Sequence, residues 1–250
     1  MIEPAGLWLI GAGNMGGALL GRWQMAGFAP VVADPRLGLH LPAGGTPATV
    51  VLAVKPQVWH AATAVLGARV GAGTLVVSVM AGVTCAALAE RFPGATVARA
   101  MPNTPASVGR AITGLFSADA TTAERGRLEA LFAAAGATLW LNAEDDFDAL
   151  TALSGSGPAY VFAFIEALAA AGEAAGLTPA VAFRLATETV GGASALADGG
   201  TPPGDLRRAV TSPNGTTAAG LAVLLPVLGP LLRNTVAAAA ARSRELGKMP

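Results

Sequence analysis

Short apolar runs alternate with amphipathic stretches along the first part of the chain. The pattern predicts five strands, over residues 7–11, 30–34, 49–54, 74–79 and 96–100. The third run is apolar almost throughout, which is typical of a strand covered on both faces. A helix is expected over 14–26, with Gly27 as its stop signal. Such alternation favours a parallel sheet flanked by helices, so we expect an α/β, Rossmann-type domain.

The segment between Asp34 and Thr49 has little room for an ordinary crossover helix. Prolines and glycines interrupt it at positions 35, 38, 42, 44, 45 and 47. This crossover is therefore expected to be an irregular loop, or else the unit has been shortened.

The pattern changes near residue 146, where long helical stretches rich in alanine begin. Helices are expected over 158–175 and from Thr178-Pro179 to about 197, with Thr178 as cap. Two more should flank Ser212–Gly215. Two uncharged runs, 70–89 and 210–232, contain glycine and proline breakers, which favour a buried strand plus loops over a membrane span. We expect a dinucleotide-binding domain over 1–145 and an all-α substrate-binding and dimerisation domain over 146–250.

Composition narrows the classes of function. The net charge is zero, so no basic surface is expected for nucleic acid. Only 13% of residues are charged and 53% are hydrophobic, which favours an oligomer with apolar interfaces. The single cysteine, Cys85, excludes a disulfide framework and a cysteine-based metal site. The first residues lack a basic region before an apolar stretch, so we expect a cytoplasmic protein without a signal peptide or a metal.

A glycine motif follows the first predicted strand and begins the first helix. It reads Gly11-Ala12-Gly13-Asn14-Met15-Gly16. In dinucleotide-binding proteins the three glycines permit the tight turn, the close approach of the pyrophosphate and the close packing of helix on strand. Asp34, at the end of the second strand, is expected to bind a ribose 2′-hydroxyl, which favours NAD. Arg36 could instead bind a 2′-phosphate, so both NADH and NADPH stay open.

Two further segments follow predicted strands at the same edge of the sheet. Ala53, Lys55 and Pro56 come after the third strand, and Lys55 is either a catalytic ammonium or a positioning group. Asn103 lies in a loop fixed by two prolines; it either contacts a carboxamide or stabilises a rigid turn.

The segment Thr211–Thr217 (TSPNGTT) is the most informative part of the second half. Pro213, Asn214 and Gly215 end one helical pattern, and Thr216 or Thr217 begins the next. A hydroxyl cap at such a helix start leaves backbone N–H groups free for a carboxylate. Asn-Gly permits left-handed backbone angles and a close approach to a ligand.

Five motifs in the same order resemble the pyrroline-5-carboxylate reductase family across nearly the whole chain. They are residues 10–15, 53–57, 99–105, 153–162 and 210–217. The resemblance implies hydride transfer from NADPH or NADH to the C=N bond of 1-pyrroline-5-carboxylate, the last step of proline synthesis. It also implies a homodimer through the helical domain, with a decamer of five dimers as a candidate for the higher assembly.

The resemblance also implies roles for single residues. Gly11 to Met15 would hold the pyrophosphate, and Ala53, Lys55, Pro56 and Ala81 would line the nicotinamide half of the site. The amides of Gly215, Thr216 and Thr217 would receive the substrate carboxylate, and the Thr217 hydroxyl would face the ring nitrogen. Glu144 matches an acid near the substrate. Because a cyclic imine is readily protonated, orientation matters more than a strong acid, and we favour the positioning role for Lys55.

Three positions depart from the family. Asn214 replaces the usual glycine, Asp34 replaces a Ser- or Asn-type residue that accepts a 2′-phosphate, and the span 34–49 is short. A β-hydroxyacid dehydrogenase or imine reductase would share both halves, but the former needs a lysine in the second domain, and residues 146–247 contain none. A non-catalytic nucleotide sensor is the alternative from a different class.

Overall fold

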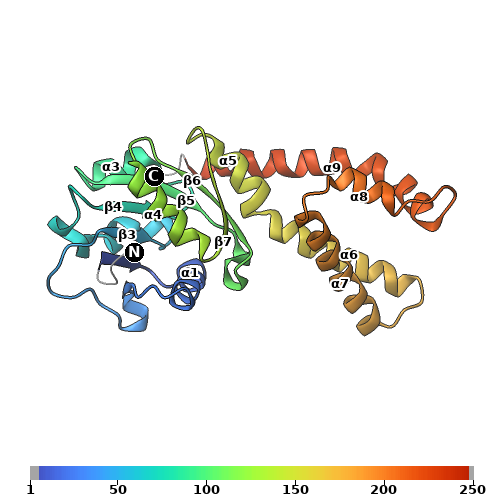
Figure 1. Cartoon of the computed structure of the whole chain (residues 1–250), viewed down its shortest axis with the longest axis horizontal. Helices are drawn as coiled ribbons and strands as arrows, with labels where there is room; N and C mark the ends of the chain where they lie inside the picture. The colour runs from blue at the N-terminus through green and yellow to red at the C-terminus, as the bar shows by residue number, and fades with distance from the viewer. Residues whose placement is uncertain (1–5, 248–250) are drawn as a thin grey trace. The chain divides into compact units, whose positions relative to one another are not determined.

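The computed structural model describes residues 6–247, which contain one seven-stranded sheet in the order β2-β1-β3-β4-β5-β6-β7 (Figure 1). The strands are β1 (Leu7–Ile10), β2 (Val31–Ala33), β3 (Thr49–Leu52), β4 (Leu75–Ser78), β5 (Thr96–Met101), β6 (Ala111–Phe116) and β7 (Gly136–Trp140). Neighbouring strands are parallel except β5 and β6. The predicted α/β fold class is confirmed.

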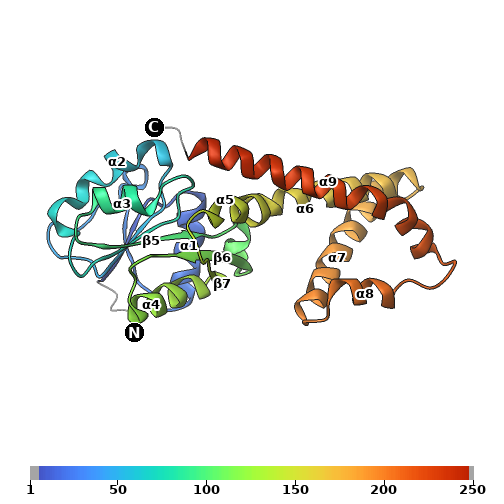
Figure 2. The same cartoon turned by 90° about the horizontal axis from the view of Figure 1, so that it is seen from above.

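Helices cover both faces of this sheet. Figure 2 shows α2 (Trp59–Ala62) and α3 (Cys85–Arg91) on one side and α4 (Thr122–Ala133) on the other. Helix α1 (Asn14–Met25) shares a buried cluster with α4 through Leu19, Trp23, Leu128 and Phe132. Successive residues of β1 point to opposite faces, so Leu7 and Leu9 enter this cluster while Trp8 and Ile10 enter the other.

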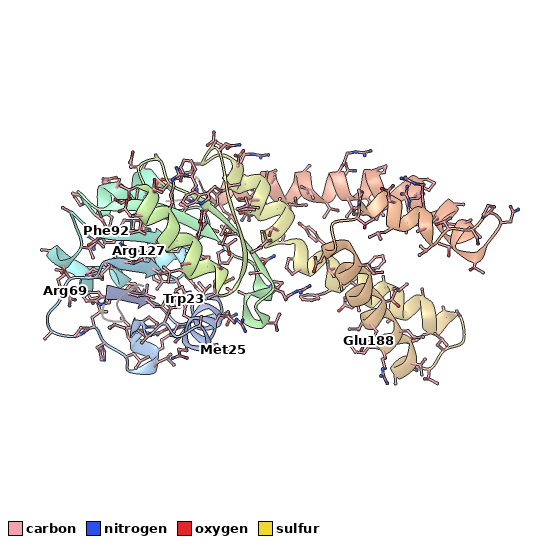
Figure 3. The ribbon with its side chains drawn as sticks, in the orientation of Figure 1. Trp23, Met25, Arg69, Phe92, Arg127 and Glu188 are labelled. Carbon is pink, nitrogen blue, oxygen red and sulfur yellow. The ribbon has the colours of Figure 1, made fainter. Side chains whose placement is uncertain are left out.

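Hydrogen bonds fasten α4 to the rest of the sheet layer. The indole Nε1 of Trp23 donates to the Leu131 carbonyl at 2.8 Å, and Arg22 Nε donates to the Ala134 carbonyl at 3.0 Å. From α4 itself, Arg127 Nη1 donates to the Ala48 carbonyl at 3.1 Å. Trp23 and Arg127 are labelled in Figure 3. The Trp23 bond satisfies a carbonyl near the end of α4, whereas Arg127 is a second donor to the Ala48 carbonyl, which also accepts from the Leu75 amide at 3.0 Å.

The five predicted strands are confirmed within one or two residues, but the sheet is not wholly parallel. Only nine residues join β5 to β6, and they form a loop with the short 3₁₀ turn η5 (Thr104–Val108). A parallel pairing needs a crossover of a dozen residues or more, so this link favours the antiparallel pairing that is observed. Helix α4 begins at a capping box between Thr121 and Glu124, a signal that the sequence contains.

The crossover after β2 is an irregular loop. Of the two expectations, an irregular loop or a shortened unit, the first is confirmed. Its regular structure among the described residues is limited to the 3₁₀ turn η2 (Pro35–Leu37), which ends at Gly38 with a φ of +67°. Strand β2 lies at the edge of the sheet, so this loop passes β1 before entering β3.

Two compact units are found in the chain. The first takes the described residues up to Ser156 and those from Ala239 on, and the second is Gly157–Ala238. At the end of the first lie α5 (Asp146–Leu150) and a π-helical turn, η6 (Thr151–Gly155). The second contains α6 (Gly157–Ala174), α7 (Pro179–Asp198), α8 (Pro203–Ala209) and most of α9 (Thr216–Leu246).

The predicted helices of this second part are confirmed, with two corrections. The Thr178 side chain makes no capping hydrogen bond, although Pro179 does begin α7. The run 210–232 is not a strand with loops, because Pro226 and Pro230 lie inside the continuous helix α9. The two prolines are four residues apart, so the missing N–H groups fall on one side of the helix and the other backbone bonds persist.

By length and composition alone, two described helical stretches could span a membrane, Asp146–Ala174 and Thr216–Leu246. Both lie within the helical half of the sequence. Their apolar side chains are largely exposed in the single chain, and a subunit interface would bury them equally well.

Candidate active site

Steric crowding fixes two of the three glycines in the motif after β1. Gly11 has a φ of +91°, and a Cβ atom there would lie 2.7 Å from the Ala53 carbonyl oxygen. A Cβ at Gly16 would lie 2.1 Å from the Gly11 carbonyl oxygen and 3.1 Å from the Ala53 Cβ. These are the tight turn and the close helix–strand packing that the sequence predicts. Neither position accepts a side chain without moving backbone.

The start of α1 is open to a ligand. Gly13 occupies the cap position and supplies no side-chain hydrogen bond. The first N–H groups of a helix have no acceptor within the helix, and they carry its positive dipole end. The start of α1 is therefore suited to an anion such as a pyrophosphate.

Asp34 is buried beside this loop, with only 2% of its surface exposed. Its Oδ2 accepts hydrogen bonds from the Ala12 amide at 2.8 Å and from Arg36 Nη2 at 2.7 Å. Its Oδ1 accepts from the Arg36 amide at 3.0 Å and from Arg36 Nε at 3.1 Å. The hydrogen-bonded Arg36 side chain holds the pKa of Asp34 well below its usual range, against the opposing effect of burial.

The carboxyl ends of β1, β3 and β4 meet at one edge, as parallel strands require. This arrangement brings the predicted residues Ala53, Lys55 and Pro56 onto the same edge as Gly11 and, after β4, Ala81. Lys55 is exposed and caps the 3₁₀ turn η3 (Pro56–Val58) without a side-chain bond. No hydrogen bond or ion pair is recorded for its ammonium group within residues 6–247.

The turn after Ala81 carries a contact that the sequence did not predict. Gly82 has a φ of +77°, and a Cβ there would lie 3.3 Å from the Gly247 Cα. The last turns of α9 are also held by Ser243, whose Oγ donates to Asp148 Oδ1 at 2.6 Å. The end of α9 thus packs onto the turn predicted to line the nicotinamide.

Glu144, the acid predicted near the substrate, is engaged within the first unit. Its Oε1 accepts from the Cys85 amide at 2.8 Å and from Arg99 Nη1 at 2.9 Å. The Arg99 guanidinium lies 4.1 Å from the centre of the Phe147 ring. Burial, with the charge of Glu144 adding to it, raises the pKa of the Cys85 thiol to about 12. In this arrangement Glu144 stabilises the start of α3 and the buried arginine.

Asn103 also has partners within the chain. Its Nδ2 donates to the Ser154 carbonyl and Oγ, both at 3.3 Å, and its Oδ1 accepts from the Ile112 amide at 3.1 Å. The side chain therefore joins the loop after β5 to the π-helical turn. π-Helical turns are frequent at functional sites, but this one could not be predicted from its glycines and serines.

In the second unit, the 211–217 loop has the backbone that its sequence predicts. Asn214 has a φ of +58°, the single left-handed non-glycine among the described residues. Helix α9 begins at Thr216, so the cap position belongs to Gly215 and the expectation of a hydroxyl cap is wrong. The Gly215 amide donates to the Ser212 carbonyl at 3.1 Å. Of the three amides predicted to bind a carboxylate, those of Thr216 and Thr217 are left at the open helix start.

A pocket of about 820 Å³ lies beside this loop, between α8 and α9. Its lining combines the polar residues Arg207, Arg208 and Thr211 with apolar side chains of α9. An open helix start with cations nearby is suited to a small carboxylate.

Comparison with known proteins agrees with this geometry. Residues 144–246 match the family described as pyrroline-5-carboxylate reductase dimerisation. The chain is 38% identical to the pyrroline-5-carboxylate reductase of Pseudomonas aeruginosa over 85% of each chain. Its structure resembles the enzyme of Coxiella burnetii at 32% identity with a TM-score of 0.91, covering 99% and 100% of the two chains. The Plasmodium falciparum pyrroline carboxylate reductase, solved with NADP bound, has 26% identity and a TM-score of 0.84, over 99% and 100%. The chain belongs to the pyrroline-5-carboxylate reductase family.

Proposed function

We propose that the chain carries out the reaction for which its family is named, with the site residues predicted from its sequence. The reaction reduces 1-pyrroline-5-carboxylate to proline, and NADPH or NADH is the cofactor. Family membership supports the reaction and the enzyme class. The structural observation that carries the proposal is the start of α9, where left-handed Asn214 precedes the first helical amides, those of Thr216 and Thr217, and the Thr217 hydroxyl.

The cofactor would occupy the carboxyl edge of the sheet, in the domain proposed over residues 1–145. The backbone of Gly11–Gly16 fits a pyrophosphate, because its crowded glycines bring the chain close and the start of α1 is uncapped. Lys55, Pro56, Ala53 and Ala81 would line the nicotinamide half, with Lys55 as a positioning group. A bound nicotinamide supplies the hydride.

The substrate would be held in the domain proposed over 146–250. The Thr216 and Thr217 amides would bind its carboxylate, and Gly215 would shape the loop and not donate. The Thr217 hydroxyl would bond the ring nitrogen and orient the C=N carbon. A protonated imine is already electrophilic, so orientation suffices and no lysine or histidine acid is needed. For Glu144 and Asn103 we propose positioning roles, because their side chains already bond other parts of the chain.

The helical unit would form the subunit interface. The family that matches residues 144–246 is described by dimerisation, and large apolar side chains on α6, α7 and α9 are exposed in the single chain. Burying them favours a homodimer, with five dimers forming a decamer as the candidate higher assembly. The proposed setting is cytoplasmic, without nucleic acid or membrane as a partner.

The test is turnover. The purified protein should oxidise NADPH or NADH in the presence of 1-pyrroline-5-carboxylate and form proline in equal amount. Omission of the substrate should abolish the oxidation. Tight binding of either cofactor without proline formation would instead support the nucleotide-sensor alternative and refute the proposal.

A further inference from the structure

The hydrogen bonding of Asp34 contradicts the simplest role for an acid at the end of β2. A carboxylate offers about four lone-pair positions. All four are occupied here, by the Ala12 amide and by three N–H groups of Arg36. A ribose 2′-hydroxyl could reach this carboxylate only by displacing one of these donors.

Arg36 is held over the glycine loop. Its Nη2 lies 3.6 Å from the position that a Cβ of Gly13 would occupy, at the cap of α1. Pro35 fixes the local backbone, and Asp34 caps the same 3₁₀ turn through the Arg36 amide. The guanidinium is therefore preorganised by the backbone as well as by its ion pair.

The same guanidinium keeps donors for a ligand. Its side chain is 71% exposed while Asp34 is 2% exposed. Nε and Nη2 bond Asp34, and for Nη1 no partner is recorded within the described part of the chain. The loop that follows, residues 38–48, contains no helix of its own. An exposed arginine edge beside a pyrophosphate loop matches the geometry and the charge of a phosphate group.

The charge balance also differs from that of an NAD-specific site. A lone aspartate repels a 2′-phosphate, but the Asp34–Arg36 pair has no net charge, and its cation is the solvent-facing member. We propose that this reductase prefers NADPH because Arg36, anchored by Asp34, binds the 2′-phosphate of the adenine ribose. This proposal rests on the function proposed above and names the cofactor that it uses.

Affinity measurements on the full-length protein test the proposal without turnover. Calorimetric titration should show that NADP⁺ binds about 10- to 100-fold more tightly than NAD⁺, the range expected of charge-assisted hydrogen bonds. Adenosine 2′,5′-bisphosphate should bind more tightly than adenosine 5′-monophosphate by a similar factor. The difference should shrink as salt increases, because an exposed cation is screened. Equal affinity for the two dinucleotides, or tighter binding of NAD⁺, would overturn it.

Variants separate a phosphate receptor from a structural arginine. Arg36→Ala should abolish the preference while leaving NAD⁺ affinity unchanged or higher, because the Asp34 carboxylate becomes free for a hydroxyl. Adding Asp34→Asn to Arg36→Ala should recover part of the NADP⁺ affinity by removing the repulsion. Arg242→Ala, which deletes an exposed arginine paired with Glu245 on α9, should change neither affinity.

An equal loss of both affinities in Arg36→Ala, with a lowered melting temperature, would mean that Arg36 only supports the loop, and would refute the proposal. Failure here is distinct from failure of the proposed function. Proline formation with NADH alone would leave the reaction standing and overturn the NADPH preference. Proline formation with neither cofactor would refute the reaction, whatever the affinities show.

Discussion

At the scale of single residues, the Thr217 hydroxyl is the side chain on which the proposed chemistry depends most. Thr217→Ala should lower kcat/KM for 1-pyrroline-5-carboxylate by about 10- to 100-fold, the loss expected when one orienting hydrogen bond to the transition state is removed. Thr217→Ser keeps the hydroxyl and should retain most of the activity. Thr235→Ala is the control, because that hydroxyl on the same helix donates to the Leu231 carbonyl of its own helix at 2.9 Å. Wild-type kinetics in Thr217→Ala would remove Thr217 from the mechanism.

Cys85 is the single cysteine of the chain. Its thiol ionises near pH 9.0 when unperturbed, whereas burial in the folded protein raises its pKa to about 12. Between these values only the unfolded state loses the proton, so the free energy of unfolding should fall as pH rises through this window. Cys85→Ala should show a weaker fall, measured by urea unfolding from pH 8 to 11. A thiol reagent at pH 8 should label the native protein far more slowly than the unfolded one; equal rates would contradict the burial.

The sequence predicts the role of a single residue best where the local backbone conformation permits few residue types. Gly11, Gly16 and Asn214 are of this kind, and the structure has the expected crowding or left-handed angle at each. The partners of Glu144 and Asn103 are different. Glu144 bonds a residue 59 positions away and Asn103 one 51 positions away, and such pairings follow from the folded topology and not from local pattern. The ion pair of Asp34 and Arg36 was not predicted either, because the two residues were interpreted as alternative partners of the cofactor ribose.

At the scale of elements, helix α1 allows a matched comparison of two glycines. A Cβ at Gly16 would lie 2.1 Å from the Gly11 carbonyl oxygen, whereas one at Gly21 meets nothing within 4 Å. Gly21→Ala should therefore stabilise the protein by about 0.5–1 kcal/mol, the usual gain within a helix. Gly16→Ala should destabilise it and weaken dinucleotide binding, because α1 must move away from the sheet. Thermal unfolding measures the stability of both variants, and titration with NADP⁺ measures their cofactor binding. The melting temperature should rise in Gly21→Ala and fall in Gly16→Ala; a change in the same direction would contradict the prediction.

Some helices and strands could be predicted from the local sequence, and others could not. Apolar runs and turn residues were enough for the first five strands and for the helices of the second part. The antiparallel pairing of β5 and β6 depends on the length of one short link, and α9 passes through two prolines that would normally end a helix. The direction of the β5–β6 pairing and the continuity of α9 both depend on contacts summed over a whole element. A local residue pattern carries no information about that sum.

At the scale of the whole molecule, the apolar composition predicts a subunit interface, and residues 144–246, in the helical half, match a family described by dimerisation. The composition could not tell which faces are covered. Phe162 and Phe164 on α6 and Phe183 on α7 are 59%, 45% and 62% exposed, in helices whose own packing leaves them outside. Together with the other large apolar side chains that are exposed on α6, α7 and α9, they give the helical unit more apolar surface than is usual for a monomer, as is typical of a surface that another subunit buries.

The exposed apolar side chains of the helical unit predict an oligomer in solution. Wild-type protein should sediment as a dimer or a multiple of it, and its melting temperature should rise with protein concentration, because association stabilises the folded chain. Phe162→Glu places a charge in the proposed interface and should shift the mass towards the monomer and lower the melting temperature. Met25→Glu is the matched control, since Met25 is 76% exposed on α1, within the sheet unit (Figure 3), and should leave the mass unchanged. A wild-type monomer, or loss of assembly in Met25→Glu alone, would refute a helical interface and would require another explanation for the exposed aromatic side chains of α6 and α7.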